Sequence, residues 1–201
     1  KMDRTKITTI YFRNKKENIG EDAWDVSEKQ NGSIMAWTEE KRDGFMDLYL
    51  AANGNILANK DCSSLFKGYR NLKKFVGLQY FQTDQTENLS YMFDSCESLA
   101  SLDVSHFDTS HVTNMHSMFY FCERLASLDV SHFDTSQVTG MSWMFSYCNS
   151  LMSLDVSNFD TSHVKDLSVP LSKYLAVPQG VRLKTKKANG FFNKLWEKLS
   201  N

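Results

Sequence analysis

The chain has 201 residues, of which 41% are hydrophobic and 23% are charged, and its formal net charge is −1. This composition is ordinary for a globular protein with a real core, and the presence of only two prolines argues against a long disordered linker. No run of about 18 apolar residues occurs, so no membrane span is predicted. The charge is uneven: residues 92–167 carry ten acidic and two basic residues (net −8), whereas residues 168–201 carry seven basic residues and one acidic residue (net +6).

Residues 1–62 are expected to form a small β-rich cap. The segment FMDLYLAANGNILAN has Asn53-Gly54 between two apolar runs, which predicts a β-hairpin. The end of a repeat array needs such a cover with a polar outer face.

A 26-residue repeat occupies residues 63–167. Its clearest copies begin MFDSCESLASLDVSHFDTSHV at Met92, MFYFCERLASLDVSHFDTSQV at Met118 and MFSYCNSLMSLDVSNFDTSHV at Met144. A fainter copy, LFKGYRNLKKFVGLQYFQT, begins at Leu65. The period lies within the range of leucine-rich solenoids, roughly 20–29 residues. One such unit cannot bury its apolar face alone, so neighbouring units must stack.

Each repeat is predicted to contain a short strand, a capped turn and a short helix. Leu102 and Val104 alternate with Asp103, which is strand periodicity. The Asp-Thr-Ser of FDTS supplies residue types that cap a helix start. Apolar residues then recur at gaps of three and four, as on one helix face: Val112, Met115, Phe119 and Cys122. The sequence therefore predicts an α/β fold, a right-handed leucine-rich-repeat solenoid with an N-terminal β-rich cap and a C-terminal helical cap.

The repeat MFxxCxxLxxLDVSxFDTSxVTxM resembles that of BspA-like bacterial surface proteins with 26-residue leucine-rich repeats. The resemblance covers roughly residues 65–167, and the segment before them also looks like that family. Residues from Ser168 onward do not match. The resemblance implies a bacterial cell-surface or secreted protein that binds host proteins or cells.

Residues 168–201 are expected to form the C-terminal cap. In ANGFFNKLWEKLSN, Phe191, Leu195 and Leu199 share one helical face. This helix either covers the open end of the repeats or binds a membrane surface or a partner. The basic segment RLKTKK lacks a recognised nucleic-acid-binding fold around it, so no nucleic-acid partner is expected.

Several repeated cysteine, histidine and aspartate positions resemble metal-binding or disulfide sites but are expected to have structural roles. Cys96, Cys122 and Cys148 form one column without a C-x-x-C pair, which favours buried free thiols over a metal site or a disulfide. The histidine columns also accept Asn and Gln, as at Asn158 and Gln137, which favours solvated positions over metal ligands. The like-charged column Asp103, Asp129 and Asp155 needs neighbouring donors, such as the serines two residues on, or a cation such as calcium.

The positions at which the repeat stops repeating are the candidate binding residues. The residue before MF is Tyr91, Ser117 and then Trp143, and the residue four positions later is Ser95, Phe121 and then Tyr147. On a helix these two columns are neighbours, so the sequence predicts one aromatic, partner-binding patch: Tyr91, Tyr120, Phe121, Trp143 and Tyr147. The alternative is that these side chains pack between helices or under the tail.

The sequence thus predicts a non-enzymatic protein-binding protein without a cofactor, since neither a catalytic triad outside the repeat nor a phosphate loop is present. Adhesion to host matrix or cell-surface proteins is the first hypothesis, with a cell-surface or secreted location. An intracellular, cytoplasmic scaffold or an inhibitor or immunity-type binding protein is the alternative.

Overall fold

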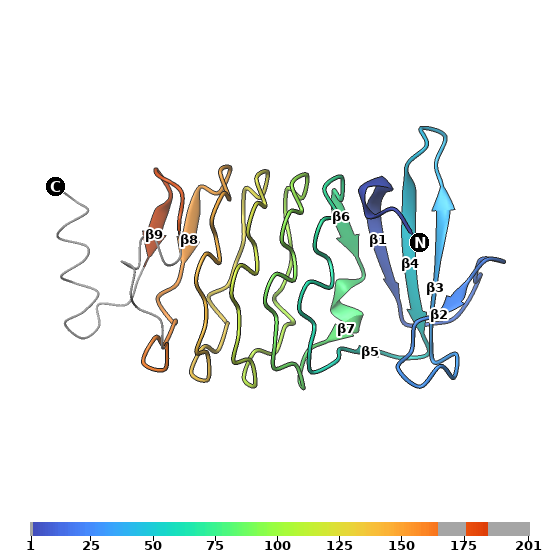
Figure 1. Cartoon of the computed structure of the whole chain (residues 1–201), viewed down its shortest axis with the longest axis horizontal. Coiled ribbons are helices and arrows are strands. Elements are labelled where there is room, and N and C mark those ends of the chain that lie inside the picture. The colour runs from blue at the N-terminus through green and yellow to red at the C-terminus, as the bar shows by residue number, and fades with distance from the viewer. Residues whose placement is uncertain (1, 165–175, 185–201) are drawn as a thin grey trace.

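The computed structural model describes residues 2–164 and 176–184. These residues form a β-rich protein with a strand-built N-terminal part and a stack of repeats (Figure 1). The elements are η1 (Arg4–Lys6), β1 (Ile7–Arg13), β2 (Trp24–Asp25), β3 (Ile34–Glu40), β4 (Met46–Ala52), β5 (Ile56–Leu57), β6 (Lys74–Val76), η2 (Leu78–Tyr80), β7 (Phe81–Gln82), β8 (Ser153–Asp155) and β9 (Arg182–Lys184).

The N-terminal part is a mixed five-stranded sheet with the strand order β2-β3-β4-β1-β6. Strand β1 pairs in parallel with both β4 and β6, whereas β3 pairs antiparallel with β2 and β4. β1 is buried along most of its length, as expected for a central strand covered on both faces. Because β6 comes from the faint first repeat, the sheet runs directly into the stack.

The hairpin predicted at Asn53-Gly54 is wrong. Strands β4 and β5 do not pair with each other, and the Gly54 N–H instead donates to the Asn14 carbonyl at 2.8 Å. The hairpin of this sheet joins β3 to β4 through residues 41–45, where Gly44 adopts a φ of +78°. Asp43-Gly44 is therefore the turn signal that folds the chain back.

The predicted α/β leucine-rich solenoid with strand-plus-helix units is wrong. The described residues contain no α-helix, and a strand forms at only one copy of the LDV segment, in β8. The fold class is β-rich, with a mixed sheet. The C-terminal helical cap was predicted for residues 168–201; of these, only residues 176–184 are described, and they contain β9.

The segment predicted to be helical is a ladder of short turns. The N–H groups of Met92, Asp94 and Cys96 each donate to the carbonyl three residues earlier, at 3.1–3.2 Å. The alternate N–H groups donate instead to the following repeat, as from Phe93 to the Met118 carbonyl at 2.9 Å. Half of the turn amides therefore bind within a repeat and half bind between repeats. This division leaves no continuous series of the i to i−4 bonds that define an α-helix.

A single core runs from the sheet through the whole stack. Phe66, Phe93, Phe119 and Phe145 stack ring upon ring, with centroids 5.6–5.7 Å apart. The alternation predicted for Leu102, Asp103 and Val104 is confirmed, since Leu102 and Val104 are buried and Asp103 is exposed; Phe107 is buried as well. The burial pattern was thus predicted correctly even though the backbone was not.

The FDTS segment joins repeats rather than capping helices. The buried Thr109 hydroxyl donates to the Asp134 carbonyl at 3.0 Å and accepts from the Asp134 N–H at 2.8 Å. Thr135 makes the same pair of bonds to Asp160. The Asp108 carboxylate accepts from the Ser110 N–H at 2.9 Å, which closes a tight turn. Thr and Asp therefore recur because every layer needs both bonds.

Candidate functional site

Two positions in every repeat hold the backbone in the left-handed region. They lie at the third residue of a turn, as Tyr91 does in the turn closed by the Met92 N–H and Ser95 does in the turn closed by the Cys96 N–H. The first column is Ser64, Tyr91, Ser117 and Trp143, and the second is Gly68, Ser95, Phe121 and Tyr147, with φ between +53° and +79°. We call these the left-handed positions. They include four of the five predicted binding residues; Tyr120 is the exception.

Every residue except glycine is costly at the left-handed positions. A side chain there brings Cβ close to the following carbonyl and costs about 1–2 kcal/mol for an L-residue, whereas glycine escapes the clash. The first repeats use Ser64 and Gly68 at these places, so the fold accepts small residues. Trp143 and Tyr147 are therefore not required by the turn geometry.

Three of the predicted aromatic residues form one cluster. The rings of Phe121 and Tyr147 stack at 4.2 Å between centroids, and Tyr120 meets both rings edge-on, at 4.8 and 5.7 Å. Tyr147 remains 47% exposed, and Trp143, four residues before it, remains 45% exposed. We call Tyr120, Phe121, Trp143 and Tyr147 the aromatic ridge.

Tyr91 lies apart from the aromatic ridge. Its ring packs edge-on against His116, with centroids 5.0 Å apart, and the Lys67 ammonium lies 4.6 Å from its centroid. Lys67 also forms an ion pair at 2.6 Å with the buried carboxylate of Asp94. Tyr91 therefore belongs to a polar cluster at the start of the stack. The helical spacing used to join it to the ridge does not exist.

The repeat cysteines lie in the core, as predicted. Each thiol donates at 3.2 Å to a phenylalanine carbonyl of the preceding layer: Cys96 to Phe66, Cys122 to Phe93 and Cys148 to Phe119. Burial raises the pKa of all three thiols, that of Cys148 to about 12. Protonated, hydrogen-bonded thiols are poor nucleophiles and poor metal ligands.

The carboxylates of the aspartate column (Asp103, Asp129 and Asp155) accept hydrogen bonds from neighbouring donors. The Ser131 hydroxyl and N–H both donate to Asp129, and these bonds lower its pKa. At Asp155 the Lys184 ammonium, 2.7 Å away, is the largest cause that lowers the pKa to about 2. The predicted role of the serines is confirmed, and β9 adds a cation that the sequence did not indicate.

His132, from the column of His106 and Asn158, and His116, which lies outside the histidine columns, make local contacts. His132 bonds through Nε2 to the Val104 carbonyl at 2.9 Å, and His116 bonds through Nδ1 to the Ser142 hydroxyl. Burial lowers the pKa of His106 and of His116. Within residues 2–164 and 176–184, no three His, Cys, Asp or Glu side chains gather as metal ligands would.

The left-handed backbone at the candidate site is not predicted by the repeat pattern, and neither is an apolar cavity between the sheet and the first layer of the stack. The available signal for the backbone was Gly68 at one of the left-handed positions, since glycine lacks the Cβ that makes a positive φ costly.

The family described as "Mycoplasma protein of unknown function, DUF285" matches residues 60–181. The match spans the stack and reaches close to β9, whereas the strands β1 to β5 lie before it. No curated protein and no solved structure matches the chain. In the part of the chain that the structure describes, no helix has the length and apolar character needed to cross a membrane.

Proposed function

The chain belongs to this DUF285 family, and we propose that it is a non-enzymatic binding protein whose aromatic ridge holds a protein partner at a bacterial surface. The observation that carries the proposal is that Phe121, Trp143 and Tyr147 occupy left-handed positions at which other layers carry serine or glycine. A fold that accepts serine or glycine at these positions instead carries large aromatic rings, and those of Trp143 and Tyr147 are half-exposed.

The chemistry of the ridge suits a protein partner. Tyr and Trp are enriched among the residues that dominate binding energy at protein interfaces. The stacked pair of Phe121 and Tyr147 is held rigid by Tyr120, so little side-chain entropy would be lost on binding. Adhesion to a host matrix or cell-surface protein follows from the BspA-like repeat motif, which makes a surface location part of the same proposal.

An intracellular interaction scaffold is the second candidate. The buried, protonated cysteines favour it as much as they favour a surface protein, because free thiols inside a core are compatible with either compartment. Both candidates use the same ridge. They differ in the source of the partner.

The experiment compares the full chain with the double variant Trp143→Gly/Tyr147→Gly. Each is tested against immobilised host matrix proteins and, separately, against proteins of a bacterial cytosolic lysate. We expect capture of a matrix protein by the wild type, and a loss of about 2 kcal/mol in the double variant, roughly 30-fold in Kd. Capture only from the cytosolic lysate would favour the scaffold.

Met152→Ala is the matched control. Met152 is an exposed apolar residue of the same stack outside the ridge, so its loss should leave the affinity unchanged. The melting temperature of every variant is measured alongside the affinity. A folded double variant that binds as tightly as the wild type would refute the role of the ridge.

A further inference from the structure

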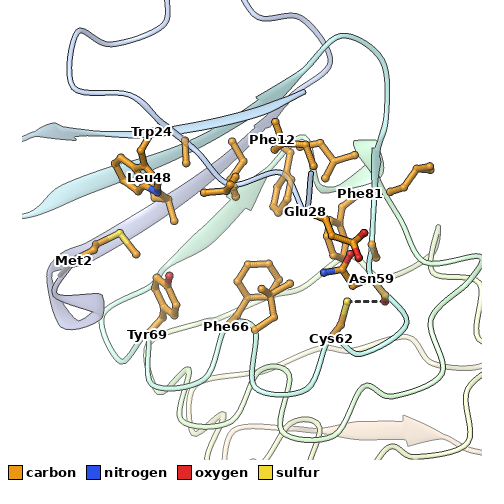
Figure 2. A pocket seen from close by; sticks show the side chains of 18 of the residues that line it. Met2, Phe12, Trp24, Glu28, Leu48, Asn59, Cys62, Phe66, Tyr69 and Phe81 are labelled. Atoms are coloured by element: carbon orange, nitrogen blue, oxygen red, sulfur yellow. Dashed lines mark hydrogen bonds between the residues drawn. The ribbon is translucent and has the colours of Figure 1, made fainter. Parts of the chain in front are cut away.

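A cavity of about 300 Å³ lies between the five-stranded sheet and the first layer of the stack (Figure 2). Phe12 of β1 and Leu48 of β4 line it from the sheet, and Phe66 and Tyr69 line it from the stack. Phe81 of β7 closes one side, with its ring 5.4 Å from that of Phe12 and 6.3 Å from that of Phe66. The wall is thus built mainly from apolar side chains.

The mouth of the cavity is also apolar. Leu57 is 66% exposed there, and Trp24 and Leu65 are exposed beside it. Charged groups of both signs stand at the margin: the Arg4 guanidinium near Tyr69, and the carboxylates of Glu28 and Asp61. With neither sign dominant at the opening and few polar groups inside, the cavity suits an uncharged molecule.

One polar group faces this space from within. Tyr69 is only 4% exposed as a residue, and its hydroxyl oxygen makes no hydrogen bond within residues 2–164 and 176–184 but is not sealed off, since it is not among the fully buried atoms that lack a partner. Figure 2 shows its oxygen directed away from the stack, toward Met2 and the sheet. Burial raises the pKa of Tyr69, so the O–H group stays protonated and can donate. The Arg4 guanidinium lies 5.3 Å from the centroid of the Tyr69 ring, and its positive charge attracts the acceptor oxygen of a molecule bound beside Tyr69.

We propose that this cavity binds a compact, uncharged molecule with an apolar ring and one acceptor oxygen, which accepts a hydrogen bond from the Tyr69 hydroxyl. Apolar cavities of about 150 Å³ already hold benzene, and pockets for small molecules begin near 300 Å³. The edges and faces of Phe12, Phe66 and Phe81 offer a ring the contacts that aromatic groups prefer. This site is separate from the aromatic ridge and does not depend on the proposed function.

The test uses two probes of similar size, acetophenone, which has an acceptor oxygen, and toluene, which has none. Binding to the full chain is measured by NMR titration for the wild type and for Tyr69→Phe. Both probes bind the wild type. The hydroxyl deletion weakens acetophenone by roughly tenfold and leaves toluene unchanged, because only acetophenone loses a hydrogen bond.

A second pair of variants tests the place of binding. Ala58 lines the cavity, so Ala58→Leu fills part of it and weakens both probes, whereas the same change at the exposed Ala100 leaves both unchanged. Melting temperatures establish that each variant is folded. The proposal is overturned if neither probe binds the wild type, if Tyr69→Phe weakens both probes equally or weakens neither, or if a folded Ala58→Leu binds both as well as the wild type does.

Discussion

The rings of Phe121 and Tyr147 lie stacked 4.2 Å apart, although both residues hold a φ near +60°. They are one repeat apart in sequence and occupy the same left-handed column. The stacking therefore follows from the register of the layers. The strain at each residue remains, because a contact between side chains does not relieve the clash of Cβ with the backbone.

Replacing Tyr147 by glycine should leave the melting temperature unchanged or raise it. Glycine removes the Cβ clash at φ +61°, worth about 1–2 kcal/mol, and this gain offsets the lost ring contacts. Tyr147→Ala keeps Cβ and should be the less stable of the two. Thermal unfolding of both variants measures the difference. A glycine variant markedly less stable than the alanine variant would show that the ring, not the turn, governs this position.

Phe133→Ala should destabilise the protein far more than Asp129→Ala. Phe133 is fully buried between layers, and large-to-alanine changes in a core cost roughly 3–5 kcal/mol. Asp129 is exposed and loses only its bonds to Ser131. Urea unfolding of both variants provides the comparison. If Asp129→Ala were the more destabilising change, the assignment of Phe133 to the core and of Asp129 to the surface would be incorrect.

Thr135→Val should cost about 1–3 kcal/mol, whereas Thr135→Ser should cost much less. Valine keeps the shape but removes the buried hydroxyl that bonds to both the N–H and the carbonyl of Asp160. Serine keeps the hydroxyl that serves both groups. The free energy of unfolding of the two variants isolates this bond pair. If both variants lost the same free energy of unfolding, the methyl group of Thr135 would contribute as much to stability as its hydroxyl.

The three repeat cysteines should resist thiol reagents in the folded protein and react once it is denatured. Their buried thiols have raised pKa values and so remain protonated near neutral pH. Thiol counting with and without denaturant, combined with metal analysis, tests this. A disulfide among Cys96, Cys122 and Cys148, or stoichiometric zinc, would contradict it.

The same thiols should make stability fall in alkaline solution. Each folded pKa is raised above the unfolded value of about 8.5, so the stabilising contribution is complete below that pH and is lost as the pH rises. Cys122→Ala should flatten this decline. Chemical unfolding between about pH 7 and pH 10 measures it.

Asp155 should titrate near pH 2, and Lys184→Ala should raise its pKa. The Lys184 ammonium is the largest cause of the low value, and the bonds from Ser157 persist in the variant, so its pKa should stay below the usual 3.9 or so. The stability that this pair contributes is present above about pH 4 and is lost as the pH falls toward 2. NMR titration of the carboxyl carbon measures both proteins. If the pKa of Asp155 were unchanged in the variant, Lys184 would not contact Asp155 in solution, and the pairing of β9 with β8 would be in error.

The sequence predicted which side chains are buried but not the path of the backbone between them. Apolar residues at gaps of three and four suit a helix. They equally suit successive turns closed by bonds to the third residue back, as at Met118 and Cys122. A helix and a series of turns differ in the acceptors of every second backbone N–H group. In the turns these acceptors are carbonyl groups of the neighbouring layer. Local pattern alone cannot distinguish a helix from such turns.

The aromatic binding residues were predicted from the spacing of an α-helix, which the described residues do not form. Phe121 and Tyr147 were selected because they break the repeat, and they do meet, but through layer stacking rather than helical spacing. Tyr91 was joined to them by the helical spacing alone, and the structure places it with Lys67 and His116. The hairpin prediction failed similarly, because Asn53-Gly54 and Asp43-Gly44 both suit a turn and only tertiary pairing selects between them.

The hydrogen bonds that join one repeat to the next run along the long axis of the stack (Figure 1). Under a pull along that axis the interfaces between repeats are in series and carry the same force, and the outermost repeat peels away first because it has a neighbour on one side only. Each released repeat of 26 residues supplies a tether of about 90 Å when fully extended. A protein holding a partner under flow would thus lengthen in steps and absorb mechanical work, while the layers still in the stack keep their shape.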